Sequence, residues 1–150
     1  MSGTGRILGL DYGTKTVGVA VSDPLFLTAQ GVEIIRREKP TKLRRTLARI
    51  EELIAEYGVT SIVLGYPMHL NGDEGDRCEA TKAFKEMLEK RTKLPVTLVD
   101  ERLTTVEADD IMIESGITDR RERKKYVDKI AAMLILQDYL NEQANLKEQD

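Results

Sequence analysis

The hydrophobic pattern of this chain changes its period part-way along the sequence, from short extended runs to longer helical stretches. Three short aliphatic runs come first, at residues 7–10, 17–21 and 31–36, and polar turn residues separate them. Runs of this kind predict a three-stranded antiparallel meander. Residues 41–57 then follow the helical period, and Gly58 ends that helix. Its predicted apolar face consists of Leu43, Leu47, Ile50, Ile54 and Tyr57.

The rest of the chain alternates strands with helices. A continuous apolar run at residues 62–65 indicates a strand that is buried on both faces, and residues 96–99 indicate another buried strand after Pro95. A helix lies between them, residues 104–107 form a capping box that opens another helix, and Gly116 ends it. The last helix is apolar on nearly all sides over residues 126–140. For the helix between the strands at residues 62–65 and 96–99, the predicted inner face consists of Ala80, Ala83, Phe84, Met87 and Leu88.

This order of elements predicts an α/β domain. We expect a mixed five-stranded sheet, in which three antiparallel strands are followed by two parallel ones, with helices flanking the sheet. No repeat and no long linker divides the sequence, so residues 1–150 are expected to form a single domain. The polar and acidic residues 141–150 are expected to form a frayed tail.

The composition excludes several kinds of site. Cys78 is the only cysteine and His69 the only histidine, which excludes an intrachain disulfide, a zinc cluster of such residues and a base built from several histidines. Metal ligands must therefore be oxygen atoms. No apolar run approaches the roughly 20 residues of a membrane span. Because the N-terminus also enters a strand without a signal-like stretch, we expect a cytoplasmic protein that does not contact membranes.

Three carboxylates stand where burial disfavours them. Asp11 closes the first apolar run, Glu101 follows the run at residues 96–99, and Asp128 interrupts the last helix. A buried carboxylate is costly unless it is paired, hydrogen-bonded or bound to a cation. Because sites in open α/β sheets form at the carboxyl ends of strands, the three residues together predict a metal site. Taken singly, each has a simpler explanation, as a turn residue for Asp11 and as an ion-pair partner for the other two.

Positive charge is concentrated in two segments, although the chain as a whole carries a net charge of −3. That net charge argues against a protein that coats nucleic acid nonspecifically. Residues 36–49 and 120–129 nevertheless contain most of the arginines and many of the lysines. One such run is most simply a solvated face, but two runs, one of them around Asp128, favour contacts with phosphate. The candidates for nucleic-acid binding in these runs are Arg44, Arg45, Lys124 and Lys125, of which the two lysines are alternatively ion-pair partners of Asp128.

Four segments, in this order, resemble the YqgF/RuvX family over almost the whole chain. They begin with Leu10-Asp-Tyr-Gly-Thr-Lys, Gly65-Tyr-Pro-Met-His, Asp100-Glu-Arg-Leu-Thr-Thr and Lys125-Tyr-Val-Asp. The resemblance implies a ribonuclease H-like fold and a nuclease. Such proteins are described either as processors of the 5′ end of precursor 16S ribosomal RNA or as Holliday-junction-resolvase-like proteins. The family's acidic triad would fall on Asp11, Glu101 and Asp128.

A triad of this kind suits the hydrolysis of phosphodiesters by two divalent ions held about 4 Å apart. Carboxylates are hard ligands, which favours Mg²⁺ or Mn²⁺. We expect Asp11 to bridge the ions, while Glu101 and Asp128 each hold one. Related resolvases carry a fourth acidic or basic group one turn before the last aspartate, and in this chain the residue there is Lys125, which supplies no carboxylate. The lack of a fourth carboxylate predicts that the second ion binds weakly until substrate arrives.

Residues near the triad are candidates for contacts with phosphate, and the loop at residues 66–75 is a candidate cover for the cleft. Arg102 is equally well explained as an ion-pair partner of Glu101, and Thr104 as a plain helix cap. His69 is expected to be a surface residue of the loop and not a base. The candidate phosphate ligands in this group are Lys15, Arg102, Thr104 and Thr105.

Two functions of other classes are alternatives. Residues 11–15 resemble the phosphate loop of actin-like proteins and sugar kinases, but the chain has no second such loop and is too short for a two-lobed ATP cleft. A noncatalytic nucleic-acid-binding module is the other alternative, which the intact triad disfavours. The expected nucleic acid is a structured RNA, such as precursor 16S ribosomal RNA, or a branched DNA, because both offer the same phosphates. A junction resolvase should be a symmetric dimer, so monomer and homodimer both stay open.

Overall fold

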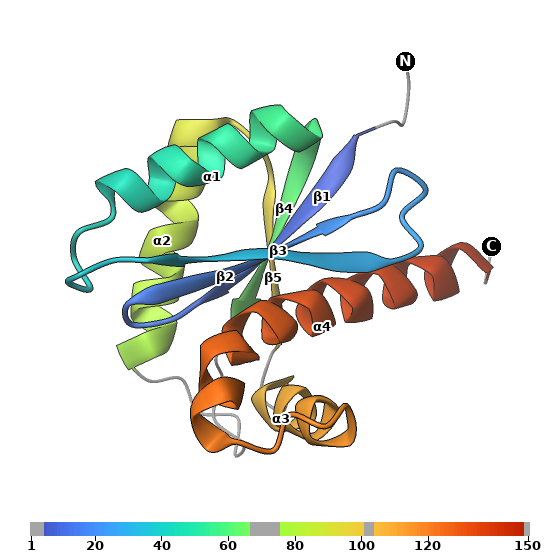
Figure 1. The fold of residues 1–150 in the computed structure, drawn as a ribbon. Coiled ribbons are helices and arrows are strands. Elements are labelled where there is room, and N and C mark those ends of the chain that lie inside the picture. The colour runs from blue at the N-terminus through green and yellow to red at the C-terminus, as the bar shows by residue number, and fades with distance from the viewer. Residues whose placement is uncertain (1–4, 67–75, 101–103, 149–150) are drawn as a thin grey trace.

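A single five-stranded sheet forms the centre of the protein (Figure 1). This computed structural model describes residues 5–66, 76–100 and 104–148. The strands are β1 (Arg6–Tyr12), β2 (Thr16–Ser22), β3 (Ala29–Arg36), β4 (Val59–Tyr66) and β5 (Val96–Asp100). Their order is β3-β2-β1-β4-β5, with antiparallel pairing from β3 to β1 and parallel pairing from β1 to β5. The predicted mixed sheet is confirmed.

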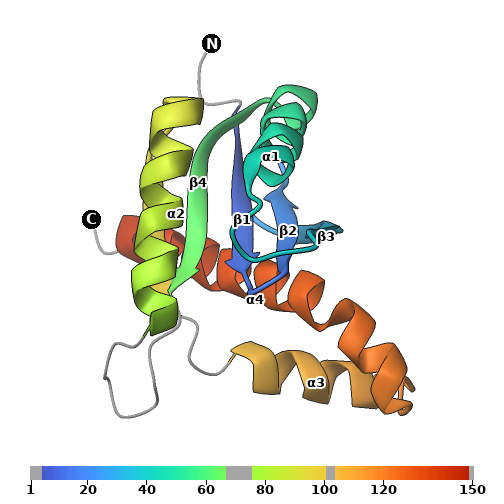
Figure 2. The same cartoon turned by 90° about the vertical axis from the view of Figure 1, so that its left-hand side faces the viewer.

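Helices cover both faces of the sheet, as Figures 1 and 2 show. On one face lie α1 (Arg44–Tyr57) and α2 (Asp76–Thr92), and on the other α4 (Arg120–Glu148) crosses the strands. The remaining helix in the described residues, α3 (Thr104–Glu114), packs against α4 on the side away from the sheet. The protein therefore has a helix–sheet–helix architecture with one additional helix outside it.

Alternation along β1 assigns its side chains to two separate cores. Leu8 and Leu10 are fully buried and pack with the α1 and α2 side, together with Ile50 and Phe84. Ile7 packs on the opposite side, in the core that α4 forms with the sheet. The residues with odd numbers in β1 therefore face α4, and this face holds the candidate site.

Glycines in the strands allow α4 to lie close to the sheet. A Cβ atom at Gly9 would stand 2.8 Å from the Cβ of Leu136, closer than real side chains approach. A Cβ atom at Gly18 would overlap the backbone oxygen of Asp128. The space at Gly9 thus accommodates the helix, and any larger residue at either position would push α4 away.

The buried face of α2 differs from the predicted one. Phe84 and Leu88 are buried as expected, but Ala80, Ala83 and Met87 are exposed. The buried stripe is completed by Cys78 and Thr81, each at most 1% exposed. The prediction was wrong because it counted only clearly apolar residues, whereas a cysteine and a threonine at helical spacing occupy the inner positions.

The helix ends also differ from those that the sequence pattern predicted. The last helix begins at Arg120 and continues to Glu148, so residues 141–148 are helical and the expectation of a frayed tail was wrong for them. The first helix begins at Arg44, later than expected, because Lys42 and Leu43 donate their N–H groups within a tight turn to the carbonyls of Lys39 and Thr41. Polar sequence at a helix end does not prevent the backbone from continuing as a helix.

Candidate active site

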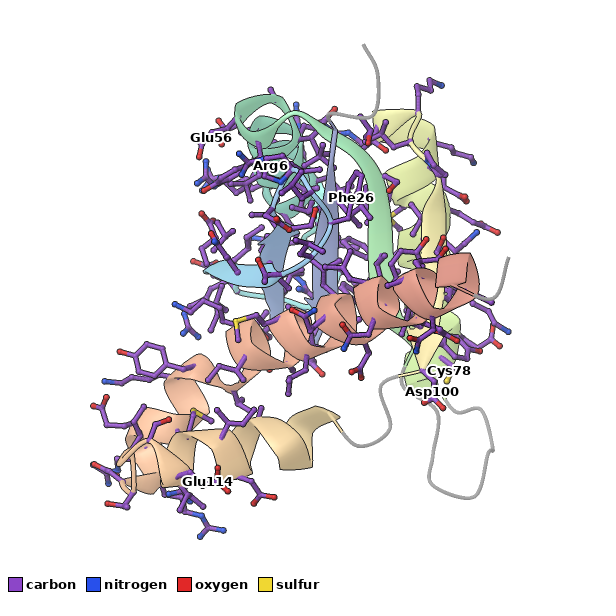
Figure 3. All side chains as sticks on the ribbon, turned by 90° about the vertical axis from the view of Figure 1, so that its right-hand side faces the viewer. Arg6, Phe26, Glu56, Cys78, Asp100 and Glu114 are labelled. Carbon is purple, nitrogen blue, oxygen red and sulfur yellow. The ribbon has the colours of Figure 1, made fainter. Side chains whose placement is uncertain are left out.

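The carboxyl ends of β1, β4 and β5 lie along one edge of the sheet, because these strands run parallel. Asp11 is the penultimate residue of β1, and Tyr66 lies opposite Asp100 where β4 and β5 end. Figure 3 shows Asp100 at the opposite end of the molecule from Arg6 and Glu56. Asp11 is only 8% exposed. The strand thus holds a nearly buried carboxylate at the edge where sites in such sheets form.

Asp11 and Asp128 are brought to the same face of the sheet. Asp11 lies two residues after Gly9 in β1, so the two residues share a face of the sheet, and Asp11 points to the side of α4. Its direct partner in β2 is Gly18, and Gly18 is the residue against which the backbone of Asp128 lies. Two aspartates that lie far apart in the sequence therefore have the same glycine as a backbone neighbour.

A threonine that the sequence analysis did not consider fixes the side chain of Asp128. The hydroxyl of Thr16, the first residue of β2, donates a hydrogen bond to Oδ2 of Asp128. Thr16 lies two residues before Gly18, so both residues face α4. That spacing is the signal that would have identified Thr16, once α4 was known to cross β2.

An arginine that the sequence analysis did not single out as a candidate holds the turn that follows Asp11. Nη2 of Arg37 donates to the carbonyls of Gly13 and Thr14, each at 2.7 Å, and the Arg37 N–H donates to the carbonyl of Lys15 at 2.9 Å. Its guanidinium also lies 4.9 Å from the centre of the Tyr12 ring. Burial lowers the pKa of Arg37, which stays far above neutral pH because a guanidinium is not deprotonated in proteins. No local sequence signal identifies this role.

Several predicted site residues cannot be placed. Glu101 and Arg102 lie outside the described residues, as does the loop at residues 67–75 with His69. The backbone of α3 and α4 is described at three further candidates, but their side chains are not, namely those of Thr104, Thr105 and Lys124. Neither the predicted third ligand nor the predicted cover of the cleft is therefore part of the described geometry.

The predicted basic residues that can be placed are all exposed. Lys15 lies on the turn between β1 and β2. Lys125 lies on α4 with its Nζ 3.4 Å from Oε1 of Glu122, so its ion-pair partner is not Asp128. Arg44 and Arg45 form the start of α1 on the other side of the sheet. The structure does not bring these last two next to the carboxylates.

The donors on this face fit a hard cation. Asp11 and Asp128 supply carboxylate oxygens, which Mg²⁺ and Mn²⁺ prefer over softer ligands. Within the described residues no group of three or more acidic, histidine or cysteine side chains forms a complete metal site. The two aspartates are therefore part of a candidate ligand set, and Glu101 is the sequence candidate that would extend it.

Comparison with known proteins establishes the family. The model of the RuvX family, described as Holliday junction resolvase, matches residues 5–142. The chain belongs to the RuvX family. A relative from Agathobacter rectalis, named "Putative pre-16S rRNA nuclease", is 64% identical over 140 residues, which cover 93% of this chain and 97% of the relative. A protein of the same name from Lachnospira eligens is 56% identical over 135 residues, covering 90% and 96% of the two chains.

Solved structures of resolvases share the fold of this RuvX-family chain. A Thermus thermophilus RuvC, solved in complex with a Holliday junction substrate, matches with a TM-score of 0.58 at 13% identity, covering 93% of this chain and 96% of that one. The fowlpox virus Holliday junction resolvase matches with a TM-score of 0.51 at 17% identity, covering 92% and 99%. The predicted ribonuclease H-like fold is thereby confirmed. Within the described residues, no helix has the length and hydropathy that crossing a membrane requires.

Proposed function

We propose that this RuvX-family nuclease cleaves precursor 16S ribosomal RNA with divalent ions held by Asp11, Glu101 and Asp128. The enzyme class, a hydrolase of phosphodiester bonds, follows from family membership. The names of relatives up to 64% identical support the choice of RNA substrate. The observation that carries the proposal is the contact at Gly18, which sets the backbone of Asp128 against the residue that pairs with Asp11.

Within this proposal, the chain's own residues hold the ligand oxygens in position. When bound, Mg²⁺ or Mn²⁺ would supply an activated water and stabilise negative charge on the phosphate. The backbone pairing of β1 fixes Asp11, and the hydroxyl of Thr16 orients the carboxylate of Asp128. Glu101 directly follows Asp100, the last residue of β5, and is assigned as the third ligand on sequence grounds. Preorganised ligands of this kind lower the cost of assembling the site.

Basic and hydroxyl groups at the same edge are assigned to the substrate phosphate. Lys15 is exposed on the turn after Asp11, where its ammonium reaches solvent. Lys125 adds no carboxylate, so the second ion has few protein ligands and is expected to bind weakly until the substrate supplies phosphate oxygens. The remaining residues assigned to phosphate from the sequence are Arg102, Thr104, Thr105 and Lys124.

Resolution of four-way DNA junctions is the second candidate function. The description of the matching family model favours it. The chemistry of cleavage would be the same, but a resolvase must cut two strands symmetrically and therefore acts as a dimer. A protein that is monomeric while it cleaves would argue against this candidate.

A direct comparison of substrates tests the proposal. The purified protein would be given Mn²⁺ and either a fragment of precursor 16S ribosomal RNA or a four-way DNA junction, with Asp11→Asn as the inactive control. We expect cleavage of the RNA by the native protein and none by the variant. Cleavage of the junction alone would replace the proposal with the second candidate, and binding without cleavage of either substrate would indicate a noncatalytic module.

A further inference from the structure

A basic pocket of about 850 Å³ lies between the end of β3 and the start of α1. Its walls come from Ile35 to Glu38, the connection to the helix, and the first turns of α1. Glu38 is the only acidic residue among the described residues that line it. The cations that line it are Arg36, Arg37, Lys42, Arg44, Arg45 and Arg49.

Three of these cations have no acidic partner within the described residues. The guanidinium of Arg49 is held by Glu33 at 2.6 Å and by Glu52 at 3.1 Å, and that of Arg37 is bound to backbone carbonyls. Nζ of Lys42 lies 4.0 Å from Oε2 of Glu38. This is a long contact between exposed side chains, and it contributes little to stability. The cations left without a described carboxylate partner are Arg36, Arg44 and Arg45, and all three are exposed.

The start of α1 adds to this positive potential. Its N-cap is Leu43, which makes no side-chain hydrogen bond to the helix, and its first turn contains no acidic residue. The unpaired N–H groups of a helix start carry partial positive charge, so Arg44 and Arg45 occupy positions where a cation is unfavourable. An anion in the pocket would offset both the helix charge and the arginines.

The pocket is connected to the candidate active site through β2 and β3. Arg36 pairs directly with Thr16, and Thr16 is the residue that binds Asp128. Arg37, in turn, holds the carbonyls of the turn that follows Asp11. Pocket and carboxylates therefore share one edge of the sheet, with α1 on one face and α4 on the other.

We propose that this pocket binds a backbone phosphate of a single nucleic-acid strand, at a distance from the bond that is cut. The choice of nucleic acid as the ligand rests on the proposed function, whereas the anion-binding character rests on the pocket itself. Guanidinium groups and backbone N–H groups recognise phosphate oxygens without reading bases, so binding is independent of sequence. A strand that passes from the carboxylates around the edge to α1 is thereby held at two points.

Charge reversal of the pocket tests this proposal against a matched control. Arg44→Glu with Arg45→Glu is compared with Lys90→Glu with Lys93→Glu. Both lysines are exposed at the opposite edge of the sheet, Lys90 in the last turn of α2 and Lys93 directly after the helix. Fluorescence anisotropy with a labelled single-stranded RNA, without divalent ions, measures affinity at several salt concentrations. We expect the variant with both arginines replaced to bind RNA about tenfold or more weakly than the native protein. The slope of log affinity against log salt concentration should fall by the amount that corresponds to about one phosphate contact. The lysine pair should stay within about twofold of the native protein.

The same preparations are assayed for cleavage with Mn²⁺, which separates this proposal from the proposed function. If the native protein binds RNA through the arginines but does not cleave it, the result supports phosphate binding in the pocket and contradicts the proposed nuclease function. Equal binding by the arginine and lysine variants, or no binding by the native protein, would overturn the pocket. Acidic residues at a helix start stabilise it, so the arginine variant should fold. If it does not, Arg44→Gln with Arg45→Gln replaces it.

Discussion

The hydroxyl of Thr16 donates a hydrogen bond to Oδ2 of Asp128, joining the start of β2 to the first third of α4. This bond selects one orientation of a carboxylate that is assigned to metal binding. Among the described residues, the other oxygen, Oδ1, is left for a further ligand. Partners of this kind orient metal ligands, and their removal typically weakens metal affinity about ten- to a hundredfold.

Replacing Thr16 by valine should therefore weaken metal binding without unfolding the protein. We expect Thr16→Val to need about tenfold more Mn²⁺ both for half-maximal cleavage and for thermal stabilisation. Thr16→Ser keeps the hydroxyl and should behave like the native protein. An unchanged Mn²⁺ dependence in the valine variant would show that the hydrogen bond does not matter for the site.

The close contact at Gly18 predicts a large effect of a single methyl group. Gly18→Ala would place a Cβ atom against the backbone oxygen of Asp128, and a helix backbone cannot move aside locally. We expect a loss of about 3 kcal/mol in the free energy of unfolding, measured by urea denaturation. Gly31→Ala is the control, because there the Cβ would meet a side-chain atom, Cγ of Lys129 at 2.9 Å, and not helix backbone. Similar losses in both variants would contradict this reading of Gly18.

Arg37 is predicted to stabilise the turn that follows Asp11. Arg37→Gln removes the hydrogen bonds to the carbonyls of Gly13 and Thr14, so hydrogen exchange in residues 13–16 should accelerate. We expect a loss of about 2 kcal/mol in stability, since bonds to a charged group are involved. Arg6→Gln, at the opposite edge, is the control and should leave exchange in the turn unchanged. Equal exchange rates in both variants would refute the role of Arg37.

The ion pair between Glu33 and Arg49 predicts a pH-dependent contribution to stability. Arg49 donates to both carboxylate oxygens of Glu33, which lowers the pKa of Glu33 below its ordinary value of 4.5. Because the pKa of Glu33 is lower in the folded than in the unfolded state, the ion pair stabilises the protein at pH values above the unfolded pKa. This stabilisation is lost as the pH falls through the folded pKa. Glu33→Gln should cost about 1 kcal/mol at neutral pH, because the pair is partly exposed. Chemical denaturation should show this difference shrinking below pH 4.5, and a constant difference would contradict the assignment.

The order of the elements was predictable because it depends on local periodicity. Short aliphatic runs and turn residues predict all five strands, and Gly58 ends α1 in the left-handed conformation that its position requires. The inner face of α2 was less predictable, since Cys78 and Thr81 are buried by packing and not by strong hydrophobicity. The tail was misjudged for a different reason, because its polar residues are compatible with an exposed helix.

The candidate site was predictable only in part. Asp11 and Asp128 are detectable because a carboxylate in an apolar element is unusual, and the structure sets both beside Gly18. Thr16 and Arg37 bind residues that are remote in the sequence or belong to a neighbouring turn, so their roles depend on strand pairing and helix placement. Tertiary contacts of this kind leave no periodic pattern in the sequence.

Metal-dependent cleavage by carboxylate variants tests the central claim most directly. The measurement is cleavage of a precursor 16S ribosomal RNA fragment in Mn²⁺ by Asp11→Asn and by Asp128→Asn. Glu56→Gln, an exposed carboxylate at the opposite edge, is the control, and circular dichroism verifies that each variant is folded. The account predicts a loss of about a thousandfold or more in both site variants and none in the control, because bound metal supplies several kcal/mol of stabilisation. Full activity in either folded site variant would contradict it.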